Sequence, residues 1–189
     1  MVLVRFLLLQ EENGLIPRVH ADELNPTGGA EMAARVGAIS ADHLLQISQQ
    51  GIQDLKEHNV IPILLPGTAF FIQKPNYAPA REMIEAGCQV ALATDFNPGS
   101  SFTQNLPFIM SLACLNMGML PNEVINAVTK NAAKSLNIFN HTGSIETGKQ
   151  ADFIVLDIPN YKYLMYNYAV NHTSRVYKKG KCVYQKQQG

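Results

Sequence analysis

The fold is decided by the stretch Val90-Ala-Leu-Ala-Thr-Asp-Phe-Asn-Pro-Gly-Ser-Ser101. Its first six residues, 90–95, are a short apolar run that ends in a carboxylate, which predicts a buried strand. Pro98 and Gly99 require a loop, because proline lacks a backbone donor and glycine permits turn geometry. A lone aspartate at the C-terminal end of a buried strand is how α/β enzymes present a metal or a base to a ligand. The alternative is that Asp95 caps a helix or orders its own turn.

Three earlier segments resemble this strand in composition and also end in a loop. They are residues 16–21, 38–44 and 60–65. Their apolar residues are nearly continuous, which predicts parallel strands covered on both faces. Helices are predicted between the strands, at 30–36, 48–58 and 80–86, with Ser48 as an N-cap and a loop over 67–79.

The four strand ends recur at a nearly regular spacing. They fall at His20, His43, Pro66 and Asp95, which are 23, 23 and 29 residues apart. One strand-and-helix unit of a (β/α)8 barrel takes roughly 30 residues. The sequence therefore predicts an α/β fold that contains four of the eight units of such a barrel.

The pattern changes after residue 141. Residues 106–117 and 121–136 still predict helices, with Pro121 in a first helical turn. Residues 143–157 predict a turn into a strand, and 174–184 predict a hairpin. We expect two domains, 1–141 with the barrel units and 142–189 with β-strands of a different layer.

Composition argues against several classes of protein. The 189 residues are 47% apolar and 16% charged, which is typical of a folded globular protein. Lys plus Arg and Asp plus Glu are both 15, so no basic excess indicates a nucleic-acid partner. The tyrosine cluster at 161–168 is expected to pack between the two layers rather than to stack on bases.

The chain start and the cysteines bear on the compartment. Residues 1–10 are apolar, but Arg5 interrupts them and no cleavage site follows, so neither a signal peptide nor a membrane span is expected. A helix is predicted at 6–13, ended by Gly14. The three cysteines are widely spaced and predict reduced thiols in a cytoplasmic protein.

Three candidate ligands or catalysts stand at the predicted strand ends: His20, His43 and Asp95. Parallel strands place their C-termini at one edge, so these side chains are expected to converge. Neutral imidazole together with a carboxylate suits zinc or ferrous iron. Glu23, three residues after His20, could take a proton from the attacking water. Each histidine alone could equally be a hydrogen-bonded structural residue.

Four motifs resemble the imidazolonepropionase family of the metal-dependent amidohydrolase superfamily, over about residues 14–184. They are His20-Ala-Asp-Glu-Leu-Asn-Pro26, Ser40-Ala-Asp-His-Leu44, Leu65-Pro-Gly-Thr68 and Ala93-Thr-Asp-Phe-Asn-Pro-Gly-Ser100. The segment 143–155 resembles the return of such enzymes into a small β-sandwich domain. The resemblance implies that the barrel units are strands 5–8, the C-terminal half of a (β/α)8 barrel.

The resemblance also implies an activity and a set of site residues. The family hydrolyses the ring amide of 4-imidazolone-5-propanoate to N-formimidoyl-L-glutamate in histidine degradation, with one zinc or iron (Fe²⁺ or Fe³⁺) ion. His20 and Asp95 match its metal ligands, and Glu23 and His43 match the residues that activate water and transfer protons. The matches to the substrate-binding residues are Glu23, Asn97, Gly99 and Ser100.

One part of the family pattern has no counterpart here. The family's His-x-His pair, which supplies two further ligands, occurs nowhere in the sequence. We therefore expect the C-terminal half of an enzyme, inactive alone, with a small-molecule substrate, a missing N-terminal half and a homodimer as candidate partners, and no membrane. Two alternatives stay open: another cyclic amidohydrolase or a deaminase, and a non-catalytic binding or dimerisation piece.

Overall fold

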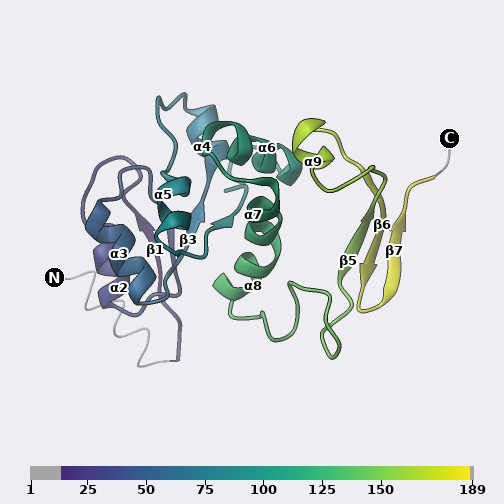
Figure 1. The fold of residues 1–189 in the computed structure, drawn as a ribbon, viewed down its shortest axis with the longest axis horizontal. Coiled ribbons are helices and arrows are strands. Elements are labelled where there is room, and N and C mark those ends of the chain that lie inside the picture. Colours follow the sequence, from purple (N-terminus) through teal and green to yellow (C-terminus); the bar gives the residue numbers. More distant parts are fainter. Residues whose placement is uncertain (1–13, 188–189) are drawn as a thin grey trace.

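The computed structural model describes residues 14–187, and the helix predicted at 6–13 lies outside them. A parallel sheet contains the strands β1 (Arg18–Ala21), β2 (Ser40–His43), β3 (Ile61–Leu64) and β4 (Ala91–Leu92), in that order (Figure 1). The four predicted strands and their parallel pairing are confirmed. All four strands therefore end at the same edge of the sheet.

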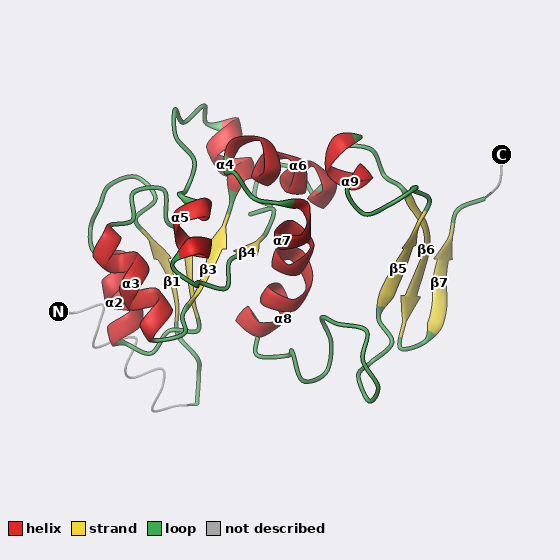
Figure 2. Ribbon diagram, viewed as in Figure 1, coloured by secondary structure: helices red, strands yellow, loops and turns green. Residues whose placement is uncertain are grey.

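Helices cover one face of this sheet. They are α2 (Gly29–Arg35), α3 (Gln49–Glu57) and α5 (Ala80–Glu85), close to the predicted positions (Figure 2). The Ser48 side chain accepts a hydrogen bond from the Gly51 N–H, so the predicted N-cap is confirmed. Val19 and Ala21 of β1 are buried in the core shared with α2.

The other face of β1 is not covered within residues 14–187, contrary to the expectation from its apolar run. Arg18 and His20 are exposed, whereas Val19 and Ala21 are buried. In register with them lie Ser40 and Asp42 of β2. This face of the sheet therefore carries polar groups. Exposed and buried side chains alternate along β1, as expected for a strand that is covered on one face.

The predicted loop at 67–79 is partly wrong, because α4 (Pro66–Phe71) begins directly after β3. Pro66 is at the start of this helix, where a missing N–H costs nothing. The Pro-Gly pair therefore opens a helix instead of closing a turn. Thr68 and Ala69 of α4 are buried.

The segment after β4 is helical, as predicted, but not continuous at its end. It consists of α6 (Leu106–Asn116), α7 (Pro121–Asn126), the π-helical turn η1 (Ala127–Asn131) and α8 (Ala132–Ser135). At the end of η1, Asn131 Nδ2 donates to the Val90 carbonyl at 2.7 Å. The π-helical turn, which contains one extra residue, thus lies where this segment contacts Val90, directly before β4.

A three-stranded antiparallel sheet follows, with the order β5 (Phe153–Leu156), β6 (Thr173–Lys178) and β7 (Lys181–Gln185). The predicted hairpin at Lys179-Gly180 is confirmed. The short helix α9 (Tyr163–Tyr166) was not expected. Its buried residues are Leu164 and Met165, whereas Tyr166 is 81% exposed, so the expected tyrosine packing between layers is wrong for Tyr166.

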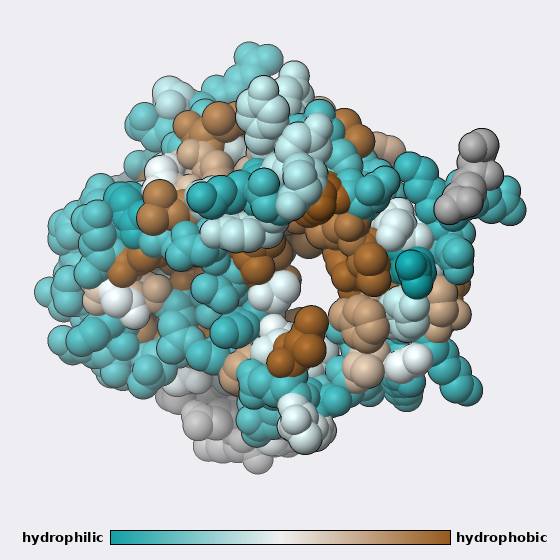
Figure 3. Space-filling view, turned by 45° about the vertical axis from the view of Figure 1, so that its right-hand side comes forward, coloured by the Kyte–Doolittle hydropathy of each residue, from teal (hydrophilic) through white to brown (hydrophobic). Residues whose placement is uncertain are grey.

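An apolar cavity of about 590 Å³ is lined by residues of α6, α7, η1, β5, α9 and β6. Figure 3 shows an opening through the molecule that is ringed by hydrophobic residues. Among residues 14–187, no helix is both long and apolar enough to cross a membrane.

Candidate active site

His20 and His43 leave neighbouring strands at the carboxyl edge of the parallel sheet, and their rings meet. His43 has a φ of +73°, a left-handed conformation that interrupts the alternation of side chains along β2. His43 Nε2 lies 3.0 Å from His20 Nδ1, and the ring centroids are 5.0 Å apart. The structure thus brings together two residues that are far apart in the sequence.

Glu23 approaches the opposite side of the His43 ring. Glu23 Oε1 lies 3.7 Å from His43 Nδ1, a buried nitrogen without a hydrogen-bond partner among the described residues. The His43 side chain is 4% exposed and that of Glu23 is 33% exposed. A buried imidazole therefore connects a carboxylate with the imidazole of His20.

The contact between the rings restricts where their protons can be. A ligating nitrogen needs a free lone pair, so His20 can bind a metal through Nε2 only with its proton on Nδ1. The proton on His20 Nδ1 points to His43 Nε2, so His43 Nε2 must be the acceptor. The proton of the neutral His43 ring must then be on its Nδ1. The proton on His43 Nδ1 then faces Glu23. His20 is 72% exposed at its side chain, so its Nε2 is open to a ligand.

Asp42 supplies a second carboxylate near His20. Its Oδ2 is 3.9 Å from His20 Nε2, too far for a hydrogen bond. Burial raises the pKa of the Asp42 carboxyl, an effect partly offset by the nearby His20 and Arg18 side chains. The Ser40 hydroxyl donates to Asp42 Oδ1 at 3.3 Å.

Asp22 has no role in the sequence-based prediction, yet it fixes the loop that carries Glu23. It is 5% exposed. Its carboxylate accepts hydrogen bonds from the Thr27 N–H (2.8 Å), the Thr27 hydroxyl (3.2 Å), the Gly29 N–H (3.1 Å) and the Ala30 N–H (2.9 Å). An aspartate ahead of a Thr-Gly-Gly turn that opens a helix is the sequence signal for such an anchor.

Asp95 lies after β4 and is held by a residue of α4. Its φ is +51°, a conformation that costs a non-glycine residue about 1–2 kcal/mol. Its Oδ2 accepts a hydrogen bond from the Thr68 hydroxyl of α4 at 2.6 Å. Its Oδ1 has no hydrogen-bond partner among the described residues. Among the described residues, the Asp95 carboxylate accepts no N–H of its own loop. The side chain therefore does not order its own turn, which was the alternative interpretation.

Asn97 is the residue that orders the loop after β4. Its Oδ1 accepts the N–H groups of Gly99 and Ser100, both at 2.8 Å. Its Nδ2 donates to the Asp95 carbonyl at 2.8 Å and contacts the Ser100 hydroxyl at 3.1 Å. Three of the four predicted substrate residues, Asn97, Gly99 and Ser100, therefore form one small hydrogen-bonded unit beside Asp95.

The predicted site consists of two groups in the described residues. His20, Glu23 and His43 form one, and Asp95 with its loop forms the other. No hydrogen bond or ion pair joins them within residues 14–187. Three interstrand steps separate β1 from β4, about 14 Å in a flat sheet, so a shared ion requires a curled sheet.

The donors at this edge fit zinc or iron by their chemistry, since imidazole nitrogen and carboxylate oxygen are ligands of both. Nowhere in residues 14–187, however, do three His, Cys, Asp or Glu side chains gather as a metal site needs. A catalytic zinc normally takes three protein ligands. His20 and Asp95 therefore fit as part of a ligand set.

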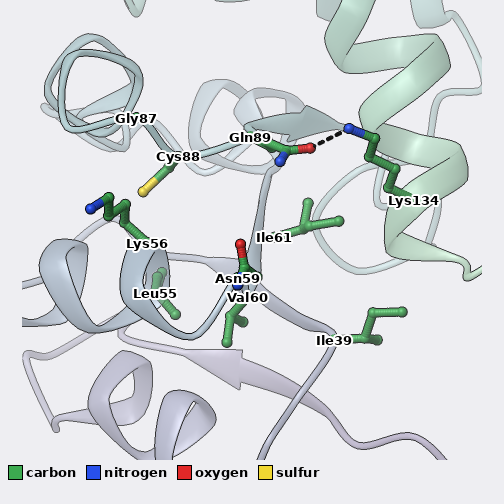
Figure 4. A pocket seen from close by; sticks show the side chains of 10 residues that line it. All are labelled: Ile39, Leu55, Lys56, Asn59, Val60, Ile61, Gly87, Cys88, Gln89 and Lys134. Atoms are coloured by element: carbon green, nitrogen blue, oxygen red, sulfur yellow. Dashed lines mark hydrogen bonds between the residues drawn. The ribbon is translucent and has the colours of Figure 1, made fainter.

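A second pocket, of about 250 Å³, lies at the opposite edge, where β2, β3 and β4 begin (Figure 4). Lys134 Nζ donates to Gln89 Oε1 across it at 2.6 Å. Burial raises the pKa of the Cys88 thiol, an effect that the nearby Lys56 only partly offsets. The thiol is therefore protonated near neutral pH, and the pocket offers no reactive nucleophile.

Comparison with known proteins relates this geometry to a family. The model of the amidohydrolase family matches residues 24–183. Proteins named imidazolonepropionase are 56% identical over 170 residues in Geobacillus sp. and 57% identical over 173 residues in Shouchella clausii. These matches cover 90% and 92% of this chain but only 40% and 38% of the relatives. The chain thus spans about two fifths of the length of these relatives.

Solved structures show the same fold at low identity. A zinc-bound adenosine deaminase from Xanthomonas campestris matches with a TM-score of 0.80 and 19% identity, over 95% of this chain and 47% of that protein. An ochratoxinase from A. niger matches with a TM-score of 0.79 and 21% identity, over 98% and 46%. The fold is thus of the amidohydrolase type, and with the match over residues 24–183 the chain belongs to the amidohydrolase family.

Proposed function

We propose that this chain supplies part of the active site of an imidazolonepropionase, which hydrolyses the ring amide of 4-imidazolone-5-propanoate to N-formimidoyl-L-glutamate. The observation that carries the proposal is the line Glu23–His43–His20 at the carboxyl edge of the sheet, with 3.7 Å and 3.0 Å between the facing atoms. The names of the relatives at 48–57% identity support this choice of substrate.

The proposal includes an architecture. Residues 1–141 correspond to the C-terminal half of a (β/α)8 barrel, and residues 142–189 to the C-terminal part of a small β-sandwich domain. The parallel order of β1 to β4 and the separate antiparallel sheet support this division. Strands β1 and β4 are the free edges of the parallel sheet, where further strands of a barrel would pair.

His20, through Nε2, and Asp95, through Oδ1, are the residues that would hold a zinc or iron ion. When bound, such an ion supplies Lewis acidity that polarises the ring carbonyl and lowers the pKa of a water molecule. The exposure of His20 and the unpartnered Oδ1 of Asp95 support these two assignments. The remaining ligands come from outside residues 14–187.

Glu23 and His43 would handle the protons. The Glu23 carboxylate accepts the proton of the attacking water and passes it to the leaving ring nitrogen. The His43 Nδ1–H faces the Glu23 carboxylate at 3.7 Å, beyond hydrogen-bond distance, and would stabilise its negative charge electrostatically. Since the His43 ring is buried and contacts His20 as well, one side chain couples the base to the metal ligand.

Asn97, Gly99 and Ser100 would bind the substrate together with Glu23. The ring and the side-chain carboxylate of an imidazolone present several hydrogen-bond acceptors and donors. The amide and hydroxyl groups of this loop are already fixed by their mutual hydrogen bonds, which reduces the entropy cost of binding.

The partner that completes the site is an N-terminal half, either upstream in a longer chain or as a separate polypeptide, and the completed enzyme is a candidate homodimer. The chain covers only 38–44% of the relatives' length, which supports this part of the proposal. The widely separated free thiols of Cys88, Cys114 and Cys182 suit the cytoplasm as its compartment.

A complementation assay tests the proposal. Purified 189-residue chain is assayed with imidazolonepropionate, alone and mixed with the N-terminal portion of the Geobacillus relative that it does not match. We expect negligible hydrolysis alone and clear hydrolysis in the mixture. Glu23→Gln should lower the rate of the mixture by about 10²–10⁴. His58→Gln is the control, because His58 contacts only its own helix at the Asp54 carbonyl.

The outcomes separate the parts of the proposal. Hydrolysis by the chain alone would contradict the need for a second half. A folded mixture that binds zinc but leaves the substrate intact would contradict the assigned reaction. Absence of stoichiometric zinc or iron from both samples would instead favour a non-catalytic binding piece.

A further inference from the structure

We propose that Thr68 is a positioning residue for the Asp95 carboxylate, and that the β3–α4 turn, Pro66-Gly67-Thr68, clamps the end of β4 into its ligand-binding conformation. This inference rests on the proposed role of Asp95 as a metal ligand. It gives a role to the segment Pro66-Gly67-Thr68, to which the proposed function assigns none.

The first contact of this clamp is the hydrogen bond from Thr68 to Asp95. Thr68 Oγ1 donates to Asp95 Oδ2 at 2.6 Å, and Thr68 is 2% exposed. A short bond between a buried hydroxyl and a carboxylate is strong, and it fixes the carboxylate plane. Oδ1 has no hydrogen-bond partner among the described residues, whereas one lone pair of Oδ2 is used by Thr68. The hydroxyl thus favours Oδ1 as the ligating oxygen of Asp95.

The second contact is the close approach of the β4 loop to Gly67. A Cβ at residue 67 would lie 2.7 Å from Ile109 Cδ1 and 3.0 Å from Ser101 Oγ. The Ser101 hydroxyl in turn donates to the Thr94 carbonyl at 2.5 Å. Ser101, which closes the loop after Asp95, is therefore packed closely on the backbone at Gly67, where a larger residue would displace the Ser101 and Ile109 side chains.

The third observation is the backbone of Asp95 itself. Its φ of +51° is unfavourable for a residue with a side chain, and persists only where surrounding contacts impose it. The Ala93 N–H donates to the Leu64 carbonyl at 3.3 Å, which fixes the chain just before this residue. The contacts to Thr68 and Gly67 fix it at and after this residue. Together they hold a strained turn that aims Asp95 at the carboxyl edge.

Thr68→Val tests the role of the hydroxyl, because valine keeps the shape and removes the hydrogen bond. Zinc affinity of the 189-residue chain, mixed with the N-terminal portion of the Geobacillus relative, is measured by competition with a chromogenic chelator. We expect Thr68→Val to bind zinc about 10- to 100-fold more weakly than the unchanged chain. Thr68→Ser, which keeps the hydroxyl, should restore the affinity to within about threefold. Thr129→Val is the matched control, since Thr129 donates only to Ile125 of its own helical segment.

A metal-free measurement keeps the inference testable independently of zinc. Urea unfolding of Thr68→Val, Asp95→Ala and the double variant forms a double-mutant cycle. We expect strong non-additivity, because each single change breaks the same hydrogen bond. Additive effects in this cycle would overturn the clamp.

The two experiments distinguish the inference from the proposed function. If Asp95→Asn weakens zinc binding but Thr68→Val does not, Thr68 is not a positioning residue and the inference is overturned. If Asp95→Asn binds zinc as the unchanged chain does, Asp95 is no ligand. That result contradicts the proposed function and, with it, the positioning role of Thr68.

Discussion

The two sheets of this molecule are stabilised in different ways. The carboxyl edge of the parallel sheet combines a fully buried core with left-handed residues at Asp22, His43 and Asp95, each fixed by side-chain contacts. The antiparallel sheet β5–β7 is mostly exposed and is tied together at its surface, where Asp152 contacts Lys178. Left-handed residues also occur in exposed turns, such as Lys179 between β6 and β7, but at the candidate site their side chains are held by specific contacts.

The largest expected effect comes from removing the anchor of the first strand end. Asp22→Ala should lower the free energy of unfolding by about 4 kcal/mol, because several buried N–H groups lose their acceptor at once. Urea denaturation followed by circular dichroism measures it. Asp22→Asn, which keeps one acceptor oxygen, should cost about half as much. Equal losses for the two variants would show that charge, not the hydrogen bonds, holds the loop.

A matched pair of truncations compares the interiors of the two sheets directly. Leu64 in β3 is 0% exposed, whereas Val183 in β7 is 63% exposed. Leu64→Ala should cost about 3 kcal/mol, because it leaves a cavity in the core. Val183→Ala should change stability by less than about 0.5 kcal/mol. A large effect of Val183→Ala in the same unfolding assay would mean that another surface covers this strand.

The smallest expected effect is a pH dependence confined to the antiparallel sheet. Asp152 accepts hydrogen bonds from Lys178, from the Lys179 N–H and from Gln150, and the Lys178 ammonium holds the pKa of Asp152 at about 2. Since the folded pKa is depressed, the stabilisation is complete above the unfolded pKa of about 4 and is lost as the pH falls through about 2.

Hydrogen exchange of β5 and β6 amides should therefore accelerate below pH 4 relative to Asp152→Asn, after correction for the intrinsic pH dependence. Amides of the parallel sheet serve as the internal control, because no contact of Asp152 reaches them in the described residues. An equal acceleration in both sheets would show that the acid effect is global and that Asp152 is not its cause.

The strand positions could be predicted from the sequence because apolar runs that end in loops are a local signal. The positions of His20, His43 and Asp95 at one edge followed from parallel topology alone. The contact between the two histidines could not be predicted, because it depends on the left-handed backbone of His43. Such a conformation is imposed by tertiary contacts and leaves no trace in local composition.

Two further differences have similar causes. Asp22 was overlooked because its four donors come from residues five to eight positions away, in a loop whose path the sequence does not specify. The helix α4 was overlooked because Pro66-Gly67 is a frequent turn signal, and only the packing of Gly67 against Ile109 and Ser101 shows why glycine is there. In both cases a polar or small residue serves a contact that depends on the folded path of the chain and not on local composition.

The exposed strand β7 affects the tendency of this protein to aggregate at high concentration. It is an edge strand whose outer backbone groups are free to pair with a strand of another molecule, and it carries the exposed apolar residues Val183 and Tyr184. Lysines surround it, at positions 178, 179, 181 and 186. Charged lysines on an edge repel an identical edge and so oppose aggregation by strand addition. We expect substitution of these lysines by neutral residues to promote strand addition at this edge, although no catalytic role is assigned to them.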